Sequence, residues 1–429
     1  MSMGLLFGSV VVLALAVFAI FASSWLQPKL PPVWEGDTEA DWKPLADIFR
    51  KNVESGLEKG GAFAVYYKGQ QVVNLRGGYA DVEAEIPWNK NTITQVMSTT
   101  KAIASITIAL LVDRGLLEYD EPIAKYWKEF AQNGKEKITL RTYLSHQAGL
   151  ITVDVPFSQK LLKSNWQEAG RILARQKPVW EPGTRHGYHM FTIGLYLDQL
   201  VRRVDSKQRS LSQYFQEEIA KPFGIDFFIG LPLEENHRCA RMYKRELSQI
   251  FTQSWESWKM FYTIMKSLGT NYAKASEPFF ETMPMIDNPS LGNNPDLRSF
   301  INAAAYGFSN AASVAKLFSI VAHGNDQTTN KTLVSKATVE SMTKPLVGGS
   351  DAVIGLNFTY ATGYVVYDSP QGTKIVGHPG WGGQFGLMDV KKDLAWSYTT
   401  NHISNCMVDA HYTKLVEAMY AVVDTLERT

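Results

Sequence analysis

Thr94-Gln95-Val96-Met97-Ser98-Thr99-Thr100-Lys101 leads directly into the apolar run 102–111. The pattern from Thr99 to Arg114 predicts a mostly apolar helix. Ser98 then lies in its first turn, with Lys101 three residues on and on the same face. A serine hydroxyl is a weak nucleophile until a base takes its proton, and a desolvated lysine one turn away can be that base. The stretch therefore predicts a nucleophile at a helix N-terminus, where developing negative charge is favoured.

The Ser-x-x-Lys spacing is weak evidence when it stands alone. It recurs at Ser313-Val314-Ala315-Lys316 and at Ser341-Met342-Thr343-Lys344, and both look like ordinary helix positions. For Ser98 in isolation, the competing interpretation is an N-terminal helix residue beside a solvated lysine. Other motifs in the chain must decide between the two.

Length and composition exclude several classes of protein. The chain has 429 residues, 45% hydrophobic, which is enough for one large domain or two intergrown ones. Its 43 basic and 42 acidic residues give a net charge of +1, so there is no electrostatic footprint for nucleic acid. Two cysteines, Cys239 and Cys406, exclude a disulfide framework, and each is better read as a small buried hydrophobe than as a nucleophile.

Residues 1–26 are predicted to be a transmembrane anchor or a signal segment. Gly4 to Leu26 carries no charge and matches the roughly 20 residues of a membrane-spanning helix. The alternative is a signal peptide cleaved near Ala22-Ser23-Ser24, which would give a secreted protein. The apolar run exceeds the usual apolar core of a signal peptide, about 7–15 residues, and no basic residue precedes it. We therefore expect an uncleaved single-pass anchor and a membrane location.

Two features of the sequence disagree on which side of the membrane the domain lies. Lys29 and Lys43 follow the span and no basic residue precedes it, which favours a cytosolic domain. Asn330-Lys331-Thr332 and Asn357-Phe358-Thr359 fit the glycosylation pattern, which would matter in a lumen.

The rest of the chain is predicted to be an α+β domain over 46–429, after a linker over 27–45 whose first part carries Pro28, Pro31 and Pro32. Strands at both ends with a helical middle predict a sheet built from the two termini, with a mostly helical second lobe and a cleft between the lobes. Strands are predicted over 62–67, 71–75, 360–367, 373–376, 384–390 and 394–400. Helices are predicted over 43–58, 140–144, 166–175, 191–204, 211–219, 251–268, 311–322 and 408–426.

A second motif is Pro182-Gly183-Thr184-Arg185-His186-Gly187-Tyr188-His189-Met190, a loop that enters a helix. Pro182 and Gly183 are turn residues, so Tyr188 is expected on a defined ledge. The pKa of a phenol beside a lysine ammonium is lowered, and the phenolate is a capable general base. The alternative is a buried aromatic side chain that anchors the loop. His186-x-x-His189 lacks the companions of a metal site, and we predict neither metal nor cofactor.

A third motif, Gly377-His378-Pro379-Gly380-Trp381-Gly382-Gly383, follows one predicted strand and precedes another. Its glycines let a backbone approach a ligand closely, as a substrate-binding strand needs. His378 could donate to a substrate oxyanion or carboxylate, or help to hold Tyr188 in its ionised state. The alternatives are a structural histidine and a strand bulge.

Together these motifs resemble the serine β-lactamase-like superfamily in order and spacing: Ser98-Thr99-Thr100-Lys101, then Tyr188, then His378-Pro379-Gly380. Leu144-Ser145-His146-Gln147-Ala148-Gly149-Leu150 and Trp180-Glu181-Pro182-Gly183 are similar to further segments of that family. The resemblance covers about residues 46–425. It implies the β-lactamase/transpeptidase-like fold, with an antiparallel sheet flanked by helices.

Within that superfamily, Met190 departs from the tyrosine-x-asparagine pattern of β-lactamases, and methionine cannot make the hydrogen bonds that the asparagine offers. Tyr188-His189, Gly194, Arg202-Arg203 and His378 resemble instead the family VIII carboxylesterases and animal β-lactamase domain-containing proteins with an N-terminal membrane segment. The resemblance implies a serine hydrolase that cleaves a small ester or amide without a cofactor.

The resemblance also implies a role for each site residue. Ser98 would form the acyl-enzyme, while Lys101 and Tyr188 share the proton transfer. The backbone N–H groups of Ser98 and Trp381 would form the oxyanion hole, and His378, Gly380 and Trp381 would line the substrate.

Two other functions stay open at this stage. One is a peptidase or D-amino-acid-type amidase acting on a short peptide substrate. The other is a membrane-anchored binding or filament-forming domain that keeps the fold without turnover. The oligomeric state is also open.

Overall fold

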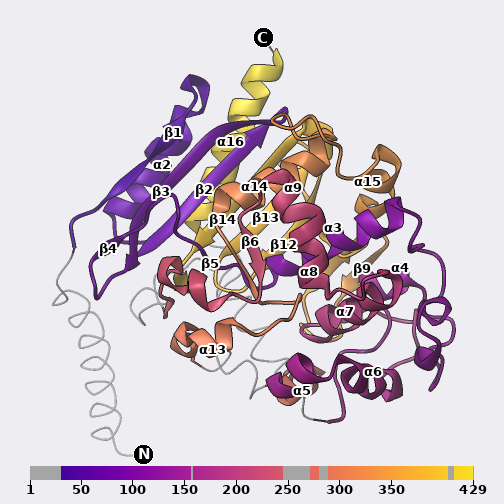
Figure 1. Ribbon diagram of the computed structural model, residues 1–429. Coiled ribbons are helices and arrows are strands. Elements are labelled where there is room, and N and C mark those ends of the chain that lie inside the picture. The colour runs from indigo at the N-terminus through magenta and orange to yellow at the C-terminus, as the bar shows by residue number, and fades with distance from the viewer. Residues whose placement is uncertain (1–29, 156–157, 245–270, 280–287, 404–409, 429) are drawn as a thin grey trace, which may run out of the picture.

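The computed structural model describes residues 30–155, 158–244, 271–279, 288–403 and 410–428 (Figure 1). The predicted anchor over 1–26, the helix predicted over 251–268 and Cys406 lie outside the described residues. Within these ranges, no helix is both long and apolar enough to cross a bilayer.

A ten-stranded sheet forms the spine of the molecule, and all its neighbouring strands run antiparallel. Its order is β1-β3-β2-β14-β13-β12-β11-β10-β9, with β4 on β3. The strands of the sheet are β1 (Trp34–Thr38), β2 (Gly60–Tyr67), β3 (Gln70–Asp81), β4 (Ile86–Pro87), β9 (Val347–Ser350), β10 (Asn357–Tyr360), β11 (Val365–Asp368), β12 (Lys374–Gly380), β13 (Gln384–Asp389) and β14 (Leu394–Thr400). Because β2 pairs with β14, the prediction of a sheet built from both ends of the chain is confirmed.

Two smaller sheets accompany the large one. One has the order β5-β8-β6 and the other pairs β15 with β7. Their strands are β5 (Thr94–Gln95), β6 (Phe227–Ile229), β7 (Tyr243–Lys244), β8 (Gly307–Ser309) and β15 (His402–Ile403).

Most of the helices come from the middle of the chain, and helices cover both faces of the large sheet (Figure 1). They are α2 (Lys43–Glu54), α3 (Thr99–Asp113), α4 (Leu140–Leu144), α5 (Gln159–Ser164), α6 (Trp166–Arg175), α7 (Thr192–Val204), α8 (Leu211–Phe215), α9 (Lys221–Phe223), α12 (Asn271–Ser276), α13 (Pro295–Arg298), α14 (Ala311–His323), α15 (Lys336–Thr343) and α16 (Ala410–Arg428).

Side-chain size along β2 explains how the sheet is covered. Phe63 and Val65 point to one face, where they pack in a cluster with residues of α2 and α16. The intervening Ala62 and Ala64 point to the other face, where they meet alanines of α14. Successive side chains of a strand alternate between faces, so small residues on one face let α14 approach closely while large ones fill the other.

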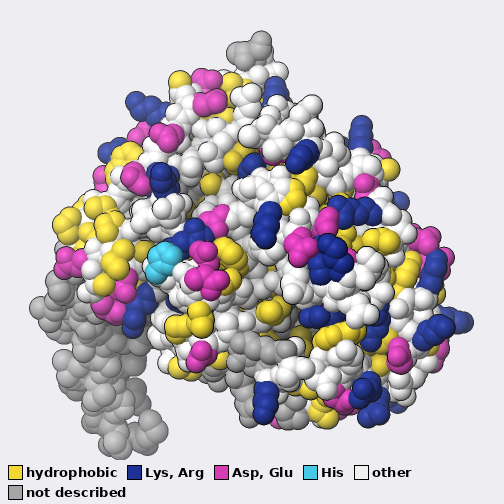
Figure 2. All heavy atoms as spheres, in the orientation of Figure 1, with side chains coloured by type: hydrophobic (Ala, Val, Ile, Leu, Met, Phe, Trp, Pro, Cys, Tyr) yellow, Lys and Arg dark blue, Asp and Glu magenta, His cyan; other side chains and the backbone are white. Residues whose placement is uncertain are grey.

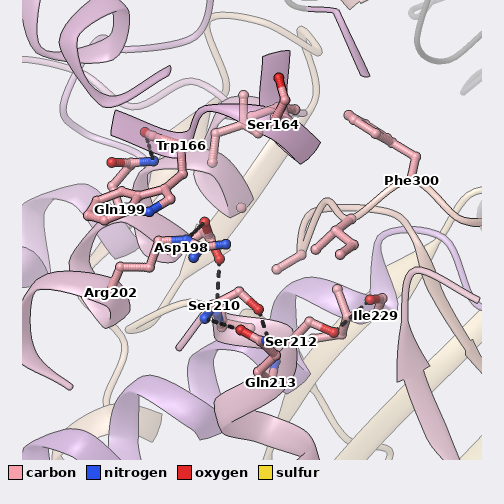
Figure 3. A pocket seen from close by; sticks show the side chains of 16 residues that line it. Ser164, Trp166, Asp198, Gln199, Arg202, Ser210, Ser212, Gln213, Ile229 and Phe300 are labelled. Carbon is pink, nitrogen blue, oxygen red and sulfur yellow. Dashed lines mark hydrogen bonds and ion pairs between the residues drawn. The ribbon is translucent and has the colours of Figure 1, made fainter. Parts of the chain in front are cut away.

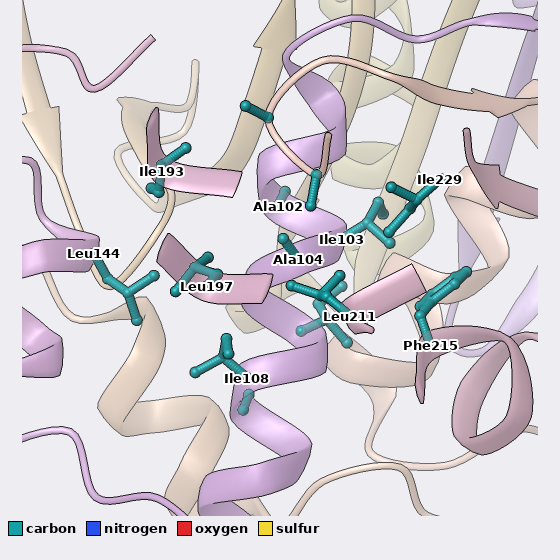
Figure 4. Packing of buried hydrophobic residues seen from close by; sticks show 14 of the residues in the cluster. Ala102, Ile103, Ala104, Ile108, Leu144, Ile193, Leu197, Leu211, Phe215 and Ile229 are labelled. Carbon is teal, nitrogen blue, oxygen red and sulfur yellow. The ribbon is translucent and has the colours of Figure 1, made fainter. Parts of the chain in front are cut away.

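Helix α3 passes through the centre of the larger core. Its residues from Thr99 to Leu111 are all buried, which accounts for a sequence that is apolar on every side. Figure 4 shows Ile103 and Ile108 of α3 packed among side chains of α7, α8 and β6. Burial of this helix fixes its N-terminus, which carries Ser98.

The region predicted as one strand over 360–367 is a hairpin, with β10 and β11 joined by a turn. Gly363 in this turn has φ +83°, and a Cβ there would overlap Ser105 Oγ of α3. The run is apolar because the turn itself is buried, so hydropathy gave no sign of the break.

The predicted linker over 27–45 and the predicted helix over 43–58 also differ from the structure. β1 pairs with β3, and α2 starts at Lys43, so the domain begins before residue 46. β1 is exposed and held by backbone hydrogen bonds, which leave no apolar pattern. Helix α2 ends at Glu54, four residues earlier than predicted.

Charged side chains of both signs are interspersed over the face seen in Figure 2. This distribution agrees with the near-zero net charge of the chain.

Candidate active site

The sequence predicted Ser98 in the first turn of this helix. The structure places it one position earlier, as the N-cap residue of α3. The preceding Met97 is in the left-handed region, with φ +47°, which is uncommon for a non-glycine residue. Such a conformation is costly and is concentrated at functional sites. Met97 is buried whereas Ser98 is half-buried, so the sharp turn presents the serine at the edge of the core.

Lys101 reaches back to the serine from the first turn of α3. Its Nζ lies 3.2 Å from Ser98 Oγ and donates to the Ala304 carbonyl at 2.8 Å. The lysine is only 1% exposed, and burial lowers its pKa well below the ordinary value. A neutral amine has a lone pair, so Lys101 can accept a proton from the serine hydroxyl.

The turn that holds Lys101 is fixed by Asn302, a buried residue. Asn302 Oδ1 accepts a hydrogen bond from the Ala304 amide at 2.9 Å, and its Nδ2 donates to the Phe191 carbonyl at 3.3 Å. Gly194 of α7 packs directly on this turn, because a Cβ there would overlap Asn302 Oδ1 and Ala304 N. One asparagine thus connects the acceptor of Lys101 with the segment that follows Tyr188.

Tyr188 lies in the loop before α7, as predicted, and it is buried. Its backbone N–H donates to Asp351 Oδ1 at 3.2 Å. Lys101 Nζ lies 4.7 Å from the centroid of the Tyr188 ring. The structure therefore brings together Ser98, Lys101 and Tyr188, which are 90 residues apart at the extremes.

His378 on β12 stacks against Tyr188, with ring centroids 5.7 Å apart. Its Nδ1 donates to the carbonyl of Pro379 at 2.7 Å, and a carbonyl only accepts. Burial, and next the nearby Lys101, lower the His378 pKa to about 3, so the ring is neutral and Nε2 is an acceptor. The sequence predicted two roles for His378, donation to a substrate oxyanion or carboxylate and support of an ionised Tyr188. With Nδ1 held by the Pro379 carbonyl, both roles require a protonated ring, which this environment disfavours.

Strand β12 is tied to the start of α3. The Thr99 hydroxyl donates to the His378 carbonyl at 3.1 Å. A Cβ on Gly380 would overlap the Val96 carbonyl, so only glycine allows the strand to approach this closely. The predicted substrate strand therefore runs directly beside the segment that leads into Ser98.

Trp381 begins the turn that follows β12. Its side chain packs on a buried cluster of Met97, Met242 and Ile403. In the part of the chain that the structure describes, neither the Ser98 amide nor the Trp381 amide donates a hydrogen bond. Within the described residues, these two amides are thus backbone donors available to an oxygen atom.

A cavity of about 360 Å³ lies elsewhere, between α7, α8 and the residues before α6 (Figure 3). Asp198 there accepts hydrogen bonds from Arg202 Nε and from the Leu211 amide, both at 2.8 Å. The cavity contains none of the predicted site residues. Among the described residues, no three His, Cys, Asp or Glu side chains gather as a metal site would require.

Asn302, Ala304 and Asp351 were missed by the sequence analysis. Ala304 acts through its carbonyl, and Asn302 and Asp351 act on backbone amides. Neither kind of contact leaves a motif, so the sequence offers no signal for these positions.

A family model and individual relatives all point to beta-lactamase-related proteins. A protein-family model described as Beta-lactamase matches residues 45–413. The esterase/beta-lactamase LipL of Mycobacterium tuberculosis is 29% identical over 361 residues, which are 81% of this chain and 78% of that protein. The serine beta-lactamase-like protein LACTB of Homo sapiens is 27% identical over 132 residues, 27% of this chain and 24% of that protein.

The solved structures give the same result for the fold. The crystal structure of a family VIII carboxylesterase aligns with a TM-score of 0.78 and 29% identity, covering 91% of this chain and all of that one. The resemblance to the serine β-lactamase-like superfamily and its fold is therefore confirmed.

Proposed function

This chain belongs to the beta-lactamase family, and from that premise we propose that it hydrolyses a small carboxylic ester through an acyl-enzyme formed on Ser98. The observation that carries this proposal is the 3.2 Å contact between Ser98 Oγ and the buried Lys101 Nζ. The esterase named among its relatives and the carboxylesterase among its structural neighbours support ester cleavage.

In the first half-reaction, Ser98 Oγ attacks the carbonyl carbon of the ester while its proton passes to Lys101 or Tyr188. The carbonyl oxygen becomes an oxyanion, which accepts hydrogen bonds from the amides of Ser98 and Trp381. Each such donor contributes about 3 kcal/mol in comparable enzymes. Collapse of the tetrahedral intermediate breaks the bond to the alkoxide, and the alcohol leaves with the proton that Ser98 gave up.

In the second half-reaction, water attacks the acyl carbon and loses a proton to Lys101 or Tyr188. The Ser98–acyl bond then breaks, Ser98 Oγ takes the proton back from the base, and the acid leaves. Lys101 suits both steps because it is held in place by the Ala304 carbonyl, and because burial lowers its pKa and so favours the neutral amine. A transient ammonium on Lys101 would face the ring of Tyr188, which favours a cation.

The neighbourhood of Tyr188 favours an ester over a β-lactam. Met190, two residues on, is an apolar side chain, 9% exposed, and offers no hydrogen bond to a substrate amide. A neutral His378 supplies no positive charge for the carboxylate that β-lactams carry.

The test is turnover of p-nitrophenyl acetate and butyrate, p-nitroanilides and nitrocefin by the purified protein and by Ser98→Ala. Ester turnover that falls by at least about 10³-fold in Ser98→Ala is expected. Ser313→Ala and Ser341→Ala are the matched controls and should retain wild-type rates.

Three results would contradict the proposal. Turnover that survives in Ser98→Ala would show that another residue is the nucleophile. Preferential cleavage of anilides would identify an amidase. A folded wild type without turnover on any of these substrates would favour a binding role.

A further inference from the structure

Two loop segments, 146–150 and 187–189, are joined by hydrogen bonds, and the second of them contains Tyr188. The Gly187 amide donates to the His146 carbonyl and the His189 amide donates to His146 Nδ1, each at 3.0 Å. In return, the Leu150 amide donates to His189 Nε2 at 3.0 Å. The two residues that flank Tyr188 are thus both held by His146.

The hydrogen bonds fix where the protons lie on both imidazole rings. A backbone N–H only donates and a carbonyl only accepts. His189 Nδ1 donates to the Gly187 carbonyl at 2.8 Å, so its Nε2 is the acceptor. His146 Nδ1 accepts, so a neutral His146 carries its proton on Nε2. Burial, and next the nearby His189, His378 and Lys101, lower the His146 pKa well below its ordinary value and keep the ring neutral.

The backbone of His146 is also unusual, with φ +62°. Histidine, asparagine and aspartate adopt this left-handed region more readily than other non-glycine residues. The position therefore requires both a left-handed backbone and a side-chain acceptor one bond beyond Cγ. Among uncharged residues, only histidine and asparagine meet both requirements.

The ring of His146 contacts two tyrosines as well. Its centroid lies 5.1 Å from that of Tyr188 and 4.7 Å from that of Tyr360, both with the rings nearly edge to face. Tyr360 in turn donates to Asp351 Oδ2 at 2.9 Å, the carboxylate that accepts from the Tyr188 amide. His146 and Asp351 thus confine Tyr188 from two directions.

We propose that His146 is a positioning residue for Tyr188, acting through the amides of Gly187 and His189. This inference rests on the esterase function proposed above, in which Tyr188 shares the proton transfer. His146 stays out of the proton path and sets the place of the phenol relative to Lys101. A displacement of about 1 Å in such a group is enough to lower a rate about 10²-fold.

The test compares His146→Asn, which keeps an acceptor at the Nδ1 position, with His146→Ala, which removes it. We expect kcat for p-nitrophenyl butyrate to fall about 30-fold in His146→Ala and no more than about threefold in His146→Asn, with KM nearly constant in both. The exposed His237 supplies the matched control, His237→Ala, which should match wild type. Thermal unfolding checks that each variant is folded.

A second measurement separates positioning from a general loss of structure. In a Tyr188→Phe background, His146→Ala should change the residual kcat by less than about twofold, because the group that His146 positions is gone. An equal loss in both backgrounds would overturn the proposal, as would wild-type kcat in His146→Ala or no rescue by His146→Asn. A wild type without ester turnover would overturn the esterase function and this inference together. An active wild type with any of the other results would overturn this inference alone.

Discussion

Three Ser-x-x-Lys pairs with the same spacing lie in three different surroundings. At the first pair, the half-buried Ser98 is an N-cap residue, and Lys101 is buried with its nitrogen on the serine and on the Ala304 carbonyl. At the second, Ser313 lies inside the first turn of α14, and its Oγ accepts from the Asp226 amide at 3.1 Å.

The lysines differ more than the serines do. Lys316 is 20% exposed, donates to the Phe223 carbonyl at 2.7 Å and lies 3.7 Å from the Asp326 carboxylate. Lys344 is the exposed C-cap residue of α15. Of the three lysines, only Lys101 is both fully buried and in contact with its serine, so desolvation of the lysine, and not spacing, distinguishes this pair from the other two.

The largest effect is expected when the lysines of the three Ser-x-x-Lys pairs are replaced in turn. Lys101→Met should lower kcat for p-nitrophenyl butyrate by about 10³-fold, because the proton acceptor of Ser98 is lost. Lys316→Met and Lys344→Met should stay within about twofold of wild type. Steady-state kinetics on all three variants measures the contrast. Similar losses in Lys101→Met and Lys316→Met would remove the distinction between the pairs.

A smaller effect is expected from replacing Asn302, near the Ser98–Lys101 pair, and Asn310, near the Ser313–Lys316 pair. Asn302→Ala leaves the buried Ala304 amide without its acceptor and frees the turn that holds Lys101, so kcat should fall about 10-fold. Asn310→Ala removes the N-cap of α14, where Oδ1 accepts from the Ser313 amide at 2.8 Å. Both variants should lose about 1 kcal/mol or more in the free energy of unfolding.

Urea unfolding and kcat, measured on both asparagine variants, separate the two roles. Only Asn302→Ala should change kcat. A fall in kcat in Asn310→Ala of the same size would mean that general loss of stability explains both results.

The smallest effect concerns the pH dependence of stability. Burial lowers the Lys101 pKa in the folded protein, while the unfolded chain has the ordinary value of 10.5. Between these two values the unfolded state binds more protons, so the stability of wild type rises with pH through this window. Lys101→Met removes this contribution. Urea unfolding across the window should therefore show a steeper rise with pH in wild type than in Lys101→Met. Parallel slopes would indicate that Lys101 is charged in the folded protein.

Much of the fold was predictable because it rests on regular patterns. The mostly apolar run of α3, the run of aromatic and β-branched residues in β2 and the strands at both ends of the chain each follow from side-chain composition along the sequence. The buried turn at Gly363 and the exposed β1 were not predictable, since neither shows a helical or strand pattern of burial. Ser98, Lys101 and Tyr188 could be selected by their motifs, and the structure brings the three together.

The sequence by itself determined the family, the α+β class and the choice of Ser98 as the candidate nucleophile, because motifs record side-chain chemistry at fixed spacing. Only the tertiary structure decided which of three equivalent lysines is desolvated, which nitrogen of His378 carries the proton, and that His146 holds both neighbours of Tyr188. These properties depend on burial and on backbone carbonyls and amides from distant segments. Every residue carries the same backbone groups, so a motif cannot encode their positions.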